Sequence, residues 1–149
     1  MCRRILLASS LGLVLAAAAS PQDADADLKK LQGEWIMASL EYDGQASPEE
    51  NVKRFRRKVD GAKYTVTITK GDDVQTVKGS FKLDPSKKPK AVDVTTKDGE
   101  GNEITILGIY ELDGDTHKVC MAPKDQPRPT DFNSSEGSGR TVIVWKRAK

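Results

Sequence analysis

Residues 60–73 read DGAKYTVTITKGDD, and this stretch decides the fold of the chain. Tyr64, Val66 and Ile68 alternate with three threonines, which is the period-two pattern of a half-buried β-strand. The Asp-Gly pair before them and the Gly-Asp-Asp run after them are residues that favour tight turns, and Asp-Gly suits the positive backbone angles of a hairpin. The stretch therefore predicts an antiparallel strand with a hairpin at each end.

The same alternation recurs along the rest of the chain and predicts seven more strands. With the first, they span residues 34–42, 52–59, 62–69, 73–83, 90–96, 103–112, 115–122 and 140–147. Short turns between consecutive strands make a meander, and an open sheet of this size would leave two unpaired edges. We therefore predict an all-β fold, an eight-stranded antiparallel up-and-down barrel with a short N-terminal helix. A two-sheet sandwich is the alternative.

The chain begins with a pattern typical of a secretory signal peptide. Arg3 and Arg4 precede an apolar run at 5–19, and small residues follow. Cleavage after residue 20, or as late as residue 26, would leave a polar lead-in at 21–30 and one barrel domain at 31–149. The apolar run is short for a membrane span. We expect an exported protein, periplasmic or extracellular, with no stable membrane span after cleavage; a retained anchor is the alternative.

The lead-in also carries the signal for the helix. Asp25 or Asp27 is expected to cap one or two helical turns through Leu28 and Leu31, and Gly33 is expected to end them.

Export changes the charge and the cysteine count of the chain. Removal of residues 1–20 takes Arg3 and Arg4 but no acid, so the formal net charge falls from +2 to zero. A neutral chain has no overall field to attract nucleic acid, and we predict no nucleic-acid partner. Cys2 leaves as well, so Cys120 has no partner within the chain, and a disulfide to a second copy stays open.

The segment GIYELDGDTHKVCM at 108–121 holds reactive residue types but predicts a hairpin around Asp113-Gly114. His117 and Cys120 are three positions apart, so on a strand they face opposite sides and cannot form a catalytic pair. The chain has a single histidine, which leaves too few nitrogen and sulfur ligands for zinc. We predict no enzymatic activity, no catalytic residue, no metal and no cofactor; a hydrolase that uses Asp93 or Asp131 is a remote alternative.

The basic run KRFRRK at 53–58 divides between the two faces of its predicted strand. Arg54, Arg56 and Lys58 share one face, which favours a solvated surface, with polyanion binding as the alternative. Arg57 lies on the other face, with Phe55. It must therefore pair with an acid, reach out of the barrel or point at a ligand.

A loop without periodicity, PKDQPRPTDFNSSEGSG at 123–139, separates the last two strands. Loops of this length in a compact domain are often functional. Arg128 and Asp131 either pair with each other while Phe132 plugs the end of the barrel, or the loop forms a lid over a ligand.

Four ordered blocks resemble a lipocalin-like domain family of planctomycete bacteria with no established activity. They are LQGEW at 31–35, KLDPSKKPKAVDV at 82–94, GIYELDGD at 108–115 and RPTDF with GSG at 128–139. The resemblance covers residues 28–149 and implies a lipocalin-like barrel, while it leaves the function open.

Gly33-Glu34-Trp35 also resembles the G-x-W pattern at the first strand of lipocalins. That resemblance implies that Trp35 packs at one end of the barrel under a basic side chain of the last strand. Arg147 is the candidate for this cation, with Lys146 second.

These observations lead to two hypotheses for function. The first is an exported, non-catalytic binding module that holds a small apolar or amphipathic ligand in the barrel. Its candidate lining residues are Met37, Tyr64, Val66, Phe81, Tyr110 and Met121, with Arg128 and Phe132 near the mouth. The alternative is a structural or protein-interaction module of the cell envelope with a filled barrel and no ligand. Its working surface, and a homodimer interface, would be the outer face of the strands at 103–112 and 140–147, with Ile143 or Trp145 buried in the contact.

Overall fold

The computed structural model describes residues 21–149, so the predicted signal peptide at 1–20 lies outside the described residues. The elements are α1 (Pro21–Leu31), β1 (Gly33–Tyr42), β2 (Gln45–Ala46), α2 (Glu49–Val52), β3 (Phe55–Asp60), β4 (Lys63–Lys70), β5 (Asp73–Asp84), β6 (Lys90–Lys97), β7 (Glu103–Asp113), β8 (Thr116–Met121) and β9 (Thr141–Arg147). Within residues 21–149, no helix combines the length and the apolar character that crossing a bilayer requires.

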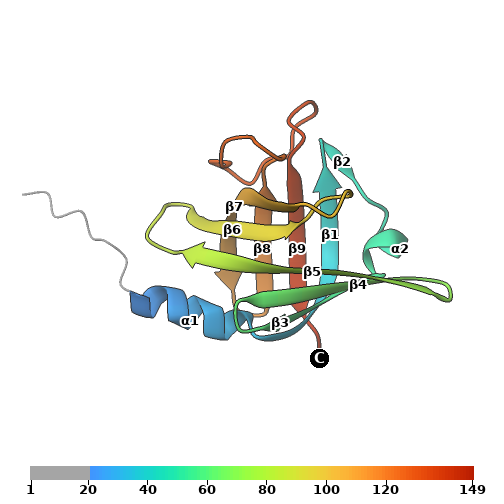
Figure 1. The fold of residues 1–149 in the computed structure, drawn as a ribbon, viewed down its shortest axis with the longest axis horizontal. Coiled ribbons are helices and arrows are strands. Elements are labelled where there is room, and N and C mark those ends of the chain that lie inside the picture. The colour runs from blue at the N-terminus through green and yellow to red at the C-terminus, as the bar shows by residue number, and fades with distance from the viewer. Residues whose placement is uncertain (1–20) are drawn as a thin grey trace, which may run out of the picture.

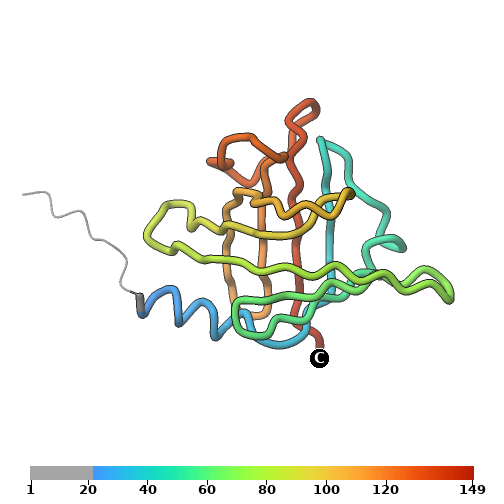
Figure 2. The backbone as a smooth tube through the Cα atoms, in the orientation of Figure 1, coloured from blue at the N-terminus to red at the C-terminus, as the bar shows by residue number. Residues whose placement is uncertain are grey.

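Eight long strands close into an antiparallel up-and-down barrel. Each pairs with the next in the order β1-β3-β4-β5-β6-β7-β8-β9, and β9 returns to pair with β1. The closing pair runs from Trp35 opposite Arg147 to Tyr42 opposite Thr141. Figure 1 and Figure 2 show the strands wrapping around a shared interior, with α1 at one end. The predicted barrel with a short N-terminal helix is confirmed, and the sandwich alternative was wrong.

One predicted strand begins later than its sequence pattern indicates. Residues 49–52, which include the start of the strand predicted at 52–59, form α2, and β3 starts at Phe55. Two acids occupy the first turn of α2, where their negative charges interact favourably with the positive end of the helix dipole. One of them, Glu49, also pairs with Lys53 at 2.7 Å. Val52 is buried against the core because the helix turns it inward. The two-residue β2, which was not predicted, is a hairpin arm on β1.

The end of α1 lies across one end of the barrel. The Gln32 side chain donates to the carbonyl of Gly61 at 3.0 Å and accepts from its N–H at 2.7 Å. Arg147 donates to the Gln32 carbonyl at 2.9 Å. We call this the closed end of the barrel. The opposite end, where Ile68 of β4 and Thr96 of β6 lie, is the open end.

The helix itself differs from its prediction in length. It begins at Pro21, before both predicted caps, and Asp27 lies inside it as a buried residue. The turn after it at Gly33, with a φ of 100°, ends the helix as expected.

The loop at 123–139 covers part of the outer face of the barrel. Ile109 of β7 and Cys120 of β8 point away from the interior, yet both are buried. Ile143 and Trp145 of β9, in contrast, line the interior. The expectation that these two residues supply an outer contact for a second copy was therefore wrong.

Candidate functional site

The interior of the barrel holds a cavity of about 310 Å3. Its walls are mostly apolar, because the inward positions of the alternating strands carry valine, isoleucine, phenylalanine and methionine. The cavity extends from Leu31 beside the closed end to Val77 at the open end. Val77 is 42% exposed, so the cavity reaches the surface there.

Five of the eight predicted ligand-contacting residues line this cavity. They are Met37, Tyr64, Val66, Phe81 and Met121. Each stands at an inward position of its strand, which the period-two pattern was sufficient to identify.

Tyr110 does not line the cavity, and the expectation for it was wrong. Its side chain is buried, and its hydroxyl donates to Oδ2 of Asp27 at 2.7 Å. Lys90 donates to the same oxygen at 2.8 Å. Tyr110 therefore belongs to the contact that holds α1 against the barrel.

Burial alone would raise the pKa of the Asp27 carboxyl. The hydrogen bonds from Lys90 and Tyr110, with the charges of Lys90 and Lys30, outweigh burial and lower this pKa below its usual value. Desolvation and the neighbouring carboxylate raise the pKa of Tyr110, so its hydroxyl stays protonated and donates.

Arg128 lies on the outside of the barrel, not at its mouth. Its Nη1 donates to the carbonyls of Val92 and Gly108 at 3.0 and 2.8 Å, and its Nη2 lies 2.7 Å from Oδ1 of Asp93. Arg128 does not line the cavity. The expectation that it lies at the barrel mouth was wrong, because these three acceptors on β6 and β7 hold its side chain elsewhere. The predicted pairing of Arg128 with Asp131 was wrong for the same reason.

Phe132 also lies outside the barrel. The Nζ atom of Lys118 is 5.0 Å from the centre of the Phe132 ring, and Lys118 alternates with the inward residues His117 and Val119. Phe132 therefore neither plugs the barrel nor lines its mouth. Both expectations for this residue were wrong.

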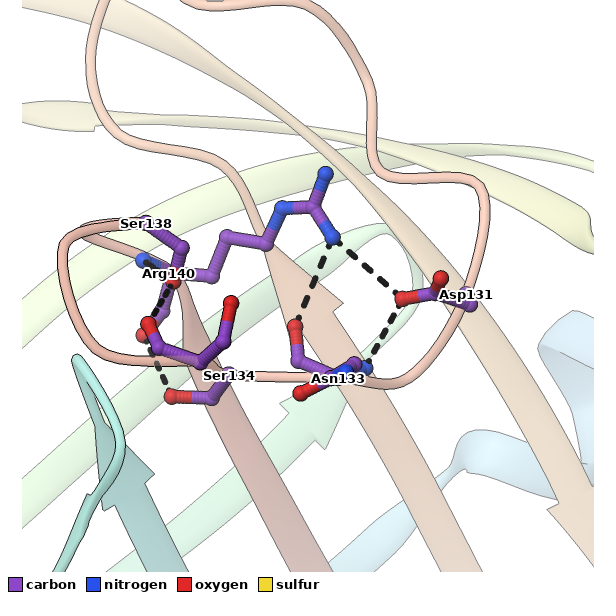
Figure 3. A network of polar contacts seen from close by, with 6 residues as sticks. Asp131, Asn133, Ser134, Ser138 and Arg140 are labelled. Carbon is purple, nitrogen blue, oxygen red and sulfur yellow. Dashed lines mark hydrogen bonds and ion pairs between the residues drawn. The ribbon is translucent and has the colours of Figure 1, made fainter.

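A polar network fixes the rest of this loop (Figure 3). Arg140 contacts Oδ1 of Asp131 at 3.3 Å and the carbonyl of Asn133 at 3.4 Å. The buried hydroxyl of Ser134 donates to the Arg140 carbonyl at 3.0 Å. The loop is also tied to the turn after β1, because the N–H of Gly44 donates to the Ser134 hydroxyl at 3.1 Å and the N–H of Gly139 donates to Oδ1 of Asp43 at 2.7 Å.

Arg57 is the cation that the sequence placed on the inner face of β3. Its guanidinium carbon lies 4.6 Å from the centre of the Trp145 ring and 5.4 Å from that of Trp35. Among residues 21–149, no carboxylate lies within ion-pair distance of it. Desolvation lowers the pKa of Arg57 to about 9, which leaves the side chain charged at neutral pH.

His117 lies beside Arg57 in the same wall. Nη2 of Arg57 lies 2.9 Å from Nδ1 of His117. Because a guanidinium only donates, Nδ1 accepts, and the ring proton resides on Nε2. Desolvation, with the Arg57 charge second, lowers the pKa of His117 well below its usual value, so the ring is neutral at pH 7. The ring also meets Trp35 and Tyr110 edge to face.

Two donors in this wall have no partner in the structure. They are Nε of Arg57 and Nε2 of His117, and both atoms are buried. Both residues line the cavity. Buried N–H groups without acceptors are uncommon in folded proteins and costly. Sequence reasoning recognised Arg57 as an inward charge but did not connect it with His117, which is 60 residues away.

Trp35, Gly33 and Arg147 meet at the closed end of the barrel. The guanidinium carbon of Arg147 lies 4.4 Å from the centre of the fully buried Trp35 ring. The Trp35 Nε1 donates to the Leu31 carbonyl at 2.8 Å. A side chain at Gly33 would approach Nη1 of Arg147 and would adopt a strained backbone angle. This arrangement joins α1, β1 and β9 at one point.

Cys120 and the acidic turns form no reactive cluster. Cys120 is 0% exposed, and burial raises the pKa of its thiol. Asp98 accepts the backbone N–H groups of Glu100 and Asn102, as turn residues do. In the part of the chain that the structure describes, no three His, Cys, Asp or Glu side chains gather in a way that would hold a metal ion.

Comparison with protein-family models, with curated proteins and with solved structures finds no match to this chain.

Proposed function

We propose that the chain is a non-catalytic binding module that takes one small apolar or amphipathic molecule into the barrel. The observation that carries this proposal is the cavity of about 310 Å3, which falls in the size range of small-molecule sites. Its apolar walls favour a ligand with an apolar body, because such a ligand leaves water on entry. The exposed Val77 at the open end supplies a route in.

The cavity also favours this function over the envelope interaction module. That alternative calls for a barrel filled with side chains, whereas the inward residues here leave space. In our proposal the module acts after export, in the periplasm or outside the cell, and its activity consists of removing the ligand from water.

Binding of octan-1-ol and of octanoate, measured by titration calorimetry, tests the proposal. A Val66→Phe variant places a larger side chain in the cavity and should weaken binding at least tenfold. Thr65→Phe is the matched control, because Thr65 has nearly the shape of valine and lies on the opposite face of the same strand. It should leave the affinity within twofold.

The proposal fails if neither compound binds the wild-type chain. It also fails if the two variants weaken binding equally, because the ligand would then occupy some place other than the barrel interior.

A further inference from the structure

The barrel wall contains a positive charge without a counter-charge. The residues that face Arg57 are Trp35 on β1, Tyr64 on β4, His117 on β8 and Trp145 on β9. None of them is a carboxylate. Among the described residues 21–149, Asp27 is the one buried acid, and it is occupied by Lys90 and Tyr110. Arg57 is half-buried. The two indole rings offset part of the cost of its desolvation, but they satisfy none of its N–H groups.

The unpartnered atoms also define the kind of group that is missing. Nε of Arg57 and Nε2 of His117 are both N–H donors, because Nδ1 of His117 already accepts from Arg57. A hydroxyl or amine would bring a further donor to this place. A carboxylate only accepts hydrogen bonds, offers two oxygens and carries the opposite charge.

The rest of the cavity determines the size and the apolar character of the remainder of the ligand. His117 lies near the start of β8 at the closed end, and from there the walls continue through Val66 and Ile68 to Val77 at the open end. A volume of about 310 Å3 corresponds to roughly ten non-hydrogen atoms, if each takes about the 30 Å3 of a water in the liquid. Octanoate has about that many, and a longer chain would extend through the open end.

We infer that the ligand is an unbranched monocarboxylic acid of medium chain length. This inference rests on the proposed function. The carboxylate binds Arg57 and His117 near the closed end, and the alkyl chain extends toward the open end. The anion supplies the acceptor and the charge that this wall lacks.

Calorimetric titration of three ligands of equal chain length tests the inference at pH 8. Octanoate should bind at least tenfold more tightly than octan-1-ol, and octylammonium should bind most weakly because Arg57 repels it. Arg57→Met should remove the preference for octanoate and keep the affinity for octan-1-ol within a fewfold. Arg56→Met is the matched control, since Arg56 is an exposed cation on the outer face of the same strand, and it should keep the preference.

A second measurement needs no variant. The chain has a single histidine, so nitrogen NMR of the labelled imidazole reports His117 alone. Octanoate should shift the Nε2–H resonance through a new hydrogen bond, whereas octan-1-ol should shift it far less.

The outcomes separate the two proposals. Equal affinity for octanoate and octan-1-ol, with equal nitrogen shifts, overturns the carboxylate inference and leaves the binding module intact. Binding of neither compound overturns both. If Arg57→Met does not fold, the wild-type affinities and the His117 shifts still decide.

Discussion

Nη2 of Arg57 and Nδ1 of His117 lie 2.9 Å apart inside the barrel, so the only histidine of the chain is held as a neutral acceptor next to a fixed charge. Two buried donors of the pair, Nε of Arg57 and Nε2 of His117, have no partner in the structure. The pair therefore has two consequences. It leaves two buried donors unsatisfied in residues that line the cavity, and it makes folding sensitive to protonation of the imidazole.

We predict that stability rises with pH between about 5 and 6.5. The folded-state pKa of His117 lies well below 6.5, so in this window the unfolded chain binds a proton that the folded chain does not. The free energy of unfolding should therefore increase with pH by up to about 1.4 kcal/mol per unit, and level off above the unfolded pKa. Urea unfolding at a series of pH values measures this slope.

A His117→Gln variant is the control, because it cannot titrate and should show a flat profile over the same window. The carboxyls with lowered pKa are Asp27, Glu49, Asp84 and Asp98, and they act at lower pH. Their contribution is present above about pH 4 and is lost as the pH falls through their folded values. A wild-type profile as flat as that of the variant would contradict the assignment.

Local sequence signals were sufficient for most of the fold but not for the site. Alternation and Asp-Gly turns indicated the strands, and short connections indicated closure, because both depend on neighbouring residues. The contacts of Arg57 with His117 and of Asp27 with Tyr110 join residues 60 and 83 positions apart. No local pattern contains such a pair. Only the inward position of Arg57 indicated a residue of the site.

The loop at 123–139 shows a different limit. Its length indicated a functional role, and Arg128 and Phe132 were recognisable as its distinctive residues. Which wall they contact depends on acceptors elsewhere, namely the carbonyls of Val92 and Gly108 and the carboxylate of Asp93. The face that a loop covers was therefore not predictable from the loop itself.

We predict that Asp27→Ala loosens α1 from the barrel and lowers the free energy of unfolding by about 2 to 3 kcal/mol. The substitution leaves the buried Tyr110 hydroxyl without its acceptor and removes the partner of Lys90. Chemical denaturation measures the loss. Asp25→Ala on the exposed side of the same helix should change stability by less than about 0.5 kcal/mol.

Tyr110→Phe combined with Asp27→Ala extends this test. The losses should fall short of additive, because both changes remove the same hydrogen bond. Full additivity would contradict the proposed contact.

The stability of the closed end of the barrel should depend on the planar guanidinium group of Arg147. Arg147→Lys keeps the charge but loses the planar group that lies over Trp35 and donates to the Gln32 carbonyl. We predict that the free energy of unfolding falls by about 1 to 2 kcal/mol. Urea denaturation monitored by tryptophan fluorescence measures this loss. The adjacent exposed Lys146, changed to Ala, should cost less than about 0.5 kcal/mol. Equal losses for the two variants would mean that Arg147 acts only as a surface charge.

Arg128 should hold the loop but not the ligand, since all its contacts lie on the outer wall. We predict that Arg128→Ala lowers stability by about 2 kcal/mol, because two backbone carbonyls and Asp93 lose a charged donor. Cys120 is 0% exposed beneath this face, so its reaction with a thiol reagent should quicken at least tenfold when the loop loosens. Cys2→Ser in every chain makes Cys120 the only thiol, and Lys124→Ala, an exposed change in the same loop, serves as the control.

Octan-1-ol and octanoate should bind the Arg128→Ala chain with affinities within twofold of wild type. The reason is that no residue of this loop lines the cavity. A faster thiol reaction with unchanged affinity would establish the loop as an outer brace. A loss of affinity that parallels the gain in thiol reactivity would instead make the loop a lid, and the open end would then have to be sought beneath it and not at Val77.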